Sequence, residues 1–207
     1  MSDNEKLSDE VRQLAAMAYG ESSPQDIAEE MGALASVLVR QRDARGYTSI
    51  STFASSDRTF SFVVNDGNAR YKRLLHASED AIAKDRGMRG AVTAARNALA
   101  GGPDLSNGAY FWDGEDIKTK YQVHFKVRHG IRFSKKSHNI FGIAESSKLI
   151  ILNRTVVKKR GGKEISREET EIGRYDHVYV STAAYGSTIF WKNNDEYMKV
   201  THAKEYK

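Results

Sequence analysis

Residues 16–27 of the chain, AMAYGESSPQDI, join two helix-forming segments through a short polar break. Gly20 disfavours helix and is expected to end the first segment, which leaves Glu21 just beyond that end. Ser23 followed by Pro24 is typical of a helix start, because the serine caps the first turn and proline fits its first position. The stretch therefore predicts two helices that meet beside a glutamate.

Apolar residues recur at helical spacing through the first hundred residues of the chain. This pattern predicts four long helices, which cover residues 7–19, 23–42, 69–84 and 88–100. Ser8 is the expected N-cap of the first helix. Glu30 lies on the side of the second helix away from its apolar stripe, so we expect its side chain to face solvent.

Beyond residue 110 the pattern changes to short runs rich in β-branched and aromatic residues. The expected strands cover residues 121–127, 149–152, 155–157, 177–180 and 185–191, with Gly161 and Gly162 at a hairpin tip. The chain is thus predicted to be α+β. Its helical N-terminal part spans residues 1–112, and a β-rich part, residues 113–207, packs on it.

The composition excludes several kinds of chemistry. The 207 residues include no cysteine, so the chain forms no disulfide, thiolate nucleophile, Cys-based zinc site or iron–sulfur cluster. No His-x-His or His-Glu-x-x-His spacing occurs, and we expect neither a metal nor a cofactor. The apolar runs are too short to span a bilayer, so membrane insertion is not expected. The net charge of +5 favours anionic partners.

Glu21 is the residue whose position is most informative about function. A carboxyl held where two helices meet is partly removed from water, and desolvation raises its pKa. Such a group stays protonated near neutral pH and donates a proton to a glycosidic oxygen. The position predicts a general acid.

Three sequence blocks carry a resemblance to a known family. They are residues 16–23, AMAYGESS; residues 60–67, FSFVVNDG; and residues 98–111, ALAGGPDLSNGAYF. In this order they resemble the SleB-like cell-wall hydrolase family, which includes the spore-cortex-lytic enzymes. The second helix of that family ends near an Asn-Arg pair, whereas residues 39–42 here read VRQR and lack the asparagine.

The resemblance covers about the first 112 residues and implies a lysozyme-like fold that acts on peptidoglycan. Such enzymes cleave between N-acetylmuramic acid and N-acetylglucosamine, and some are lytic transglycosylases in which one glutamate is acid and then base. Glu21 matches that glutamate. Aromatic faces and polar side chains in segments 60–66 and 108–113 are expected to bind the glycan strand. These candidates are Phe60, Ser61, Asn65, Asp66, Tyr110, Trp112 and Asp113.

A hydrolysing muramidase needs a second carboxylate, whereas a lytic transglycosylase uses the sugar's own 6-hydroxyl. The candidates are Asp66, Asp104, Asp113 and Glu30. Turn chemistry explains Asp66 and Asp104, and Asp113 is the one to test because it follows an aromatic run. The pattern favours transglycosylase chemistry and leaves hydrolysis open.

The first ten residues are acidic and polar, unlike a secretory signal peptide. A wall hydrolase without a signal is interpreted as an antibacterial effector delivered by an apparatus such as type VI secretion, or as a phage lysin. The effector interpretation predicts delivery to the periplasm or cell wall of a target bacterium. It also predicts a partner in the secretion apparatus and an immunity protein that fills the cleft.

Two alternatives belong to other functional classes. His124, His129 and His138 lie in the basic segment 124–139, which suits a metal-dependent nuclease toxin. The missing metal-ligand spacing argues against it, and no nucleic-acid partner is expected. A non-catalytic wall-binding module is the other alternative. The binding of such a module to the wall would not depend on Glu21.

Overall fold

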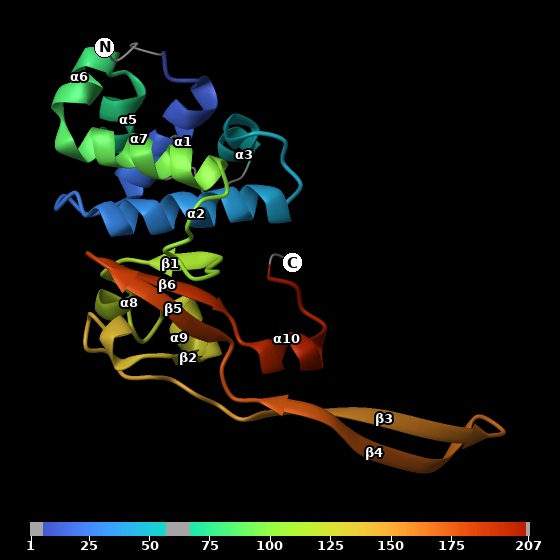
Figure 1. Ribbon diagram of the computed structural model, residues 1–207. Coiled ribbons are helices and arrows are strands. Elements are labelled where there is room, and N and C mark those ends of the chain that lie inside the picture. The colour runs from blue at the N-terminus through green and yellow to red at the C-terminus, as the bar shows by residue number, and fades with distance from the viewer. Residues whose placement is uncertain (1–5, 57–66, 206–207) are drawn as a thin grey trace.

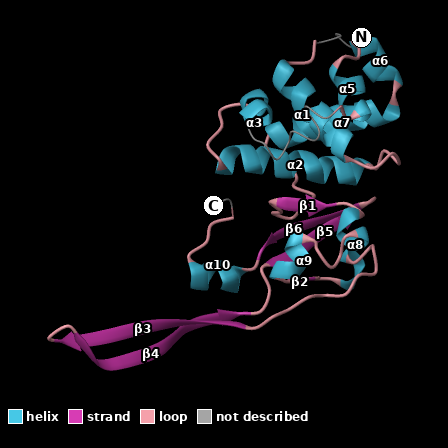
Figure 2. Cartoon of the chain, turned by 180° about the vertical axis from the view of Figure 1, so that it is seen from behind, coloured by secondary structure: helices cyan, strands magenta, loops and turns pink. Residues whose placement is uncertain are grey.

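The computed structural model describes residues 6–56 and 67–205 of the chain. It confirms the α+β class, with a helical N-terminal part and a strand-rich C-terminal part (Figure 1 and Figure 2). Four of the expected sugar-binding residues lie outside the described residues: Phe60, Ser61, Asn65 and Asp66.

Helix α1, Asp9–Glu21, begins as predicted, because the Ser8 side chain accepts a hydrogen bond from the Val11 N–H (3.3 Å). Its end differs from the prediction, since Gly20 lies inside the helix and Glu21 is its last residue. Residues 14–19 are all buried, so other elements surround this part of the helix. We attribute its continuation through glycine to that packing, which outweighs a modest helix propensity.

Helix α2, Ala28–Ala44, starts later than the Ser23-Pro24 pattern predicts. The Ser23 hydroxyl donates to the Glu30 carboxylate (2.6 Å) and therefore does not cap a helix there. Ile27 is the N-cap and supplies no side-chain hydrogen bond. At the other end Gly46 adopts a φ of 74°, a conformation that suits glycine after a helix.

Two helices replace the single one predicted over residues 69–84: α5, Ala69–Leu75, and α6, Glu79–Lys84. Ser78 separates them, because its hydroxyl accepts from the Ala81 N–H (3.2 Å) and begins a new helix. Helix α7, Arg86–Leu99, corresponds to the helix predicted over residues 88–100. Helix α3, Ile50–Ser56, follows α2.

The helical core is built largely from small side chains. Helix α1 packs against α2, α5 and α7. Alanines on the facing sides of these helices are buried, which lets the backbones approach closely: Ala15, Ala18, Ala33, Ala35, Ala91 and Ala95. Leu14, Leu34 and Leu38 fill the remaining space without solvent exposure.

A four-stranded sheet lies next to the helices, in the strand order β1-β6-β5-β2 (Figure 1). Its strands are β1, Phe111–Asp113; β2, Ile131–Arg132; β5, Tyr179–Tyr185; and β6, Thr188–Asn193. The predicted strand over 177–180 begins only at Tyr179, and the one over 185–191 is interrupted. Gly186, at a φ of 56°, turns the chain between β5 and β6.

Short helices cover the other side of the sheet, away from the helical part (Figure 1). They include α8, Asp116–Thr119; α9, Phe125–His129; and the 3₁₀ turn η2, Lys136–His138. The strand expected over 121–127 is wrong. Its apolar residues alternate, but Val123 is 70% exposed and only Val127 is buried, so the alternation does not mark a buried face.

A long two-stranded ribbon extends away from the body (Figure 1 and Figure 2). It consists of β3, Ile150–Arg160, and β4, Lys163–Tyr175, and it includes the strands expected over 149–152 and 155–157. The predicted hairpin tip is confirmed, because Gly161 and Gly162 take φ values of 58° and 77° between the strands. Helix α10, Asp195–Thr201, packs on β4 at the base of the ribbon.

The helical part and the sheet share one hydrophobic cluster. Ala183 of β5 and Phe190 of β6 belong to the same buried cluster as α1 and α2. The boundary expected after residue 112 falls inside β1. Within residues 6–56 and 67–205, no helix is long and apolar enough to cross a membrane.

Candidate functional site

A cleft of about 570 Å³ opens where the end of α1 meets the edge of the sheet. Its size is that of a small-ligand site. The helical part contributes the end of α1 and the connection to α2, and the sheet part contributes β1, α8 and the β5–β6 turn. The lining residues are Glu21, Ser22, Ser23, Pro24, Glu30, Trp112, Gly114, Glu115, Asp116, Lys120, Ser187 and Thr188.

Glu21 and Trp112, both named from sequence, meet in this cleft. The Trp112 indole Nε1–H donates a hydrogen bond to Glu21 Oε2 (3.2 Å) across 91 positions of the chain. Burial raises the pKa of Glu21, while the indole hydrogen bond lowers it by favouring the carboxylate. The net pKa stays above that of an ordinary glutamate. The cleft therefore holds a carboxyl suited to donating a proton.

Two side chains at the start of α5 fix the end of α1 just before Glu21. Asn68 Nδ2 donates to the Gly20 carbonyl (2.9 Å), and Arg70 Nε donates to the Tyr19 carbonyl (2.9 Å). The Arg70 guanidinium also lies over the Tyr19 ring, 3.8 Å from its centroid. Because the last carbonyls of a helix have no partner within it, these donors stabilise the end that carries Glu21.

Glu30 is fully buried, so the prediction that it faces solvent is wrong. Its Oε2 accepts from the Ser23 N–H (3.1 Å) and hydroxyl (2.6 Å). Its Oε1 accepts from the Ser187 N–H (3.2 Å) and the Thr188 hydroxyl (2.7 Å). A buried carboxylate needs such donors. Glu30 thus ties the α1–α2 connection to the β5–β6 turn and forms part of the cleft wall.

The close approach of that turn to Glu30 requires glycine at position 186. A Cβ added to Gly186 would lie 2.4 Å from Glu30 Oε2, and its φ of 56° is in the left-handed region. Any larger residue would push the turn away from the carboxylate.

Asp113 lies apart from the cleft. Its carboxylate is buried, and it accepts a hydrogen bond from Lys126 Nζ (2.9 Å) and lies 3.3 Å from His124 Nε2. Successive side chains of a strand point to opposite faces, so Trp112 reaches the helical side and Asp113 the other. Asp113 is therefore not among the residues that line the cleft.

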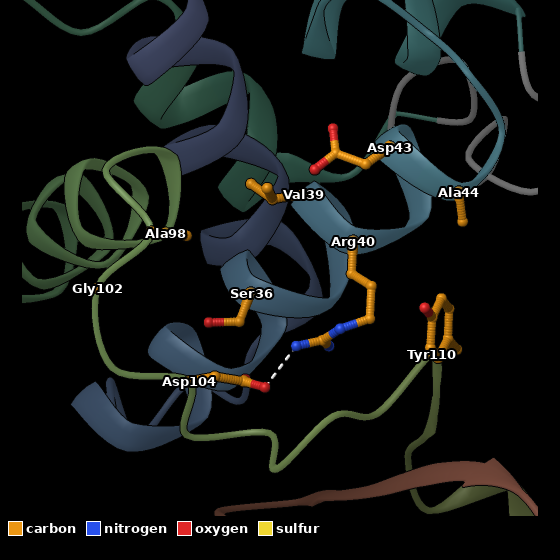
Figure 3. A pocket seen from close by; sticks show the side chains of 10 residues that line it. Ser36, Val39, Arg40, Asp43, Ala44, Ala98, Gly102, Asp104 and Tyr110 are labelled. Atoms are coloured by element: carbon orange, nitrogen blue, oxygen red, sulfur yellow. Dashed lines mark hydrogen bonds and ion pairs between the residues drawn. The ribbon is translucent and has the colours of Figure 1, made fainter.

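Tyr110 lines a separate pocket of about 330 Å³ beside α2 (Figure 3). The Arg40 guanidinium lies 5.5 Å from the Tyr110 ring centroid and pairs with Asp104. Asp104 also accepts from the N–H groups of Ser106 (2.9 Å) and Gly108 (2.8 Å). The ion pair holds the loop after α7 against α2, which agrees with the structural interpretation of Asp104.

The three histidines of the basic segment have different surroundings. His138 is buried and its Nδ1 lies 2.9 Å from Ser181 Oγ, while His129 contacts the carbonyl of Phe125 within α9. His124 lies between the carboxylates of Asp113 and Asp116. Across the described ranges, no group of three or more His, Asp or Glu side chains is placed to hold a metal ion.

The comparisons with known proteins give no family for the chain. No family model, no curated protein and no solved structure matches it.

The cleft residues that sequence reasoning missed include Asp116, Lys120, Ser187 and Thr188. The first two lie in and just after the four-residue helix α8, and the last two lie at the β5–β6 turn. The acidic residues in segment 113–116 were the one signal in the sequence, although the Asp113 side chain points away from the cleft. The local sequence does not indicate that the β5–β6 turn lines the cleft, because that placement depends on its contact with Glu30.

Proposed function

We propose that the chain is a peptidoglycan glycosidase in which Glu21 is the general acid. The observation that carries the proposal is the half-buried carboxyl of raised pKa in an open cleft, hydrogen-bonded to the Trp112 indole. Lysozyme keeps its acid protonated by the same physical means, with the carboxyl in an apolar pocket beside a tryptophan. The sequence resemblance supplies the substrate class.

The proposed reaction begins with a glycan strand bound in the cleft. The protonated Glu21 carboxyl donates its proton to the oxygen between N-acetylmuramic acid and N-acetylglucosamine as the bond to the muramic acid C1 breaks. The Trp112 indole supports the carboxylate that remains, because an N–H donor favours the charged form. Lys120 places a cation in the cleft for the carboxylates of the substrate.

The setting that we propose is the wall of a target bacterium. The enzyme would then be an antibacterial effector delivered through a secretion apparatus, and its immunity protein would cover the Glu21 cleft. The open cleft at the junction of two parts of the molecule supports this proposal, because it offers one concave surface for a blocking partner.

The test is digestion of purified sacculi by wild type and Glu21→Gln, with released muropeptides identified by mass spectrometry. Wild type is expected to release disaccharide-peptides, and Glu21→Gln to lower the rate about 100-fold or more, as for loss of a general acid. Glu29→Gln, an exposed glutamate of α2, is the matched control and should keep the wild-type rate. Equal release by Glu21→Gln and wild type would leave the non-catalytic wall-binding module as the better explanation.

A further inference from the structure

We propose that Asp116 is the second catalytic carboxylate and that the enzyme hydrolyses the glycan with Asp116 as general base. This inference rests on the proposed function and specifies its reaction. Asp116 lines the same cleft as Glu21 but comes from the sheet side, at the start of α8. The two carboxyls therefore reach one cavity from the two parts of the molecule.

Their surroundings differ in the way that an acid and a base require. Glu21 is at the end of a helix packed in the core, with an indole N–H on one oxygen. The Asp116 side chain is 52% exposed, so water reaches it. Two carboxyls in contrasting environments are the general pattern of an acid–base pair in glycoside hydrolysis.

Asp116 lies beside a buried histidine. His124 Nε2 lies 3.7 Å from Asp116 Oδ2 and 3.3 Å from Asp113 Oδ1, with the His124 side chain only 10% exposed. Lys126 Nζ donates a hydrogen bond to Asp113 (2.9 Å). The Asp116 side chain thus has a buried histidine near one of its oxygens and also lines the cavity.

The remaining acids of the cleft do not fit this role. Glu30 has no exposed surface, and each of its oxygens already accepts two hydrogen bonds. Glu115 lines the cleft as the N-cap of α8, but its side chain caps no N–H and no residue in the described ranges holds it. Among these three acids, Asp116 is the one that is exposed to water and also lies close to a buried histidine.

The proton of Glu21 passes to the glycosidic oxygen as its bond to C1 of the muramic acid breaks. A water oxygen bonds to C1, and the proton released by that water passes to Asp116. One water is consumed, and the products are a reducing muramic acid end and a free 4-hydroxyl. Solvent then returns the proton from Asp116 to Glu21.

The test digests sacculi in heavy-oxygen water with wild type, Asp116→Asn, Asp80→Asn and Glu21→Gln. Wild type is expected to yield reducing ends that carry the heavy oxygen. Asp116→Asn should slow release about 100-fold or more. Asp80→Asn, the matched change at an exposed aspartate of α6 that does not line the cleft, should stay near wild type. Formate should restore activity to Asp116→Ala, since it replaces the missing base and a misfolded variant would not respond.

The outcomes separate this inference from the function on which it rests. An anhydro product from wild type, without heavy oxygen, would overturn the role of Asp116 while leaving Glu21 as the acid. Activity of Asp116→Asn equal to that of Asp80→Asn would do the same. If wild type released nothing, or Glu21→Gln released as much as wild type, both proposals would be wrong.

Discussion

Burial and the hydrogen bond from Trp112 act in opposite directions on the pKa of Glu21, and both therefore affect the pH range of the proposed reaction. The acid works only while protonated, so the rate should fall as pH rises through the Glu21 pKa. Trp112→Phe removes the donor that favours the carboxylate, and the pKa of Glu21 should rise further. We expect the alkaline limb of the kcat–pH profile to move to higher pH. Tyr110→Phe, in the other pocket, should leave it in place, and a shift to lower pH would contradict the argument.

Glu21 should also cost the protein stability at neutral pH. Its raised pKa means that the fold favours the protonated carboxyl over the carboxylate. The protonated form therefore stabilises the fold fully below the ordinary glutamate pKa, and this contribution is lost as pH rises through the folded-state pKa. Glu21→Gln remains uncharged throughout. Its Tm should therefore exceed that of wild type at neutral pH and converge with it in acid. Thermal unfolding across pH measures this, and a constant difference at every pH would argue against a titration effect.

Glu30 shows what sequence can and cannot predict at this scale. Its helical position suggests a solvated face, but its partners Ser187 and Thr188 are 157 and 158 positions away in the chain. No local pattern reports such a contact. The position of Glu21 was predictable because it is local, at the end of one helix and close to the start of the next. The place of Asp116 was not, because the cleft that it lines is formed by distant segments.

At the scale of elements, the connection between α1 and α2 and the turn between β5 and β6 are joined through Glu30. Glu30→Ala leaves the Ser23 N–H and hydroxyl and the Ser187 N–H without their acceptor. Unpaired buried donors cost about 1–3 kcal/mol each, so the free energy of unfolding should fall by about 3 kcal/mol or more. Urea unfolding measures the loss.

Glu29→Ala is the control for this loss, since Glu29 is the exposed neighbour on the same helix. It should change the free energy of unfolding by about 0.5 kcal/mol or less. Similar values for Glu29→Ala and Glu30→Ala would show that the contact between the α1–α2 connection and the β5–β6 turn does not stabilise the fold.

Element boundaries were predictable where a cap or a turn is local. Ser8 caps α1 as expected, and the glycine pair 161–162 turns the ribbon. Prediction failed where a serine side chain binds another side chain instead of capping a helix. Ser23 binds Glu30 in place of capping α2. The same residue type is a cap or a tertiary ligand according to its distant neighbours, which the local sequence does not contain.

At the scale of the whole molecule, the body and the ribbon differ in how they are stabilised. The helices and the sheet enclose two hydrophobic clusters, whereas most β3 and β4 side chains are solvent-exposed. The ribbon contacts the body at its base, where the Tyr175 and Tyr197 rings meet edge to face with centroids 5.1 Å apart. Its distal half contributes no residue to either cluster.

Shortening the ribbon should therefore leave both the body and the cleft intact. Replacing residues 153–172 by an Asn-Gly turn keeps the base contact and removes exposed strand alone. Losses near 0.5 kcal/mol are typical of such surface changes, which for a chain of this length corresponds to about 2 °C in Tm. We expect the Tm of the shortened chain to differ from that of wild type by about 2 °C. The rate at which it releases muropeptides from short soluble glycan fragments should be unaltered. A fall in Tm of about 10 °C would mean that the ribbon is part of the cooperative fold, and a slower rate on the short fragments would mean that it reaches the cleft.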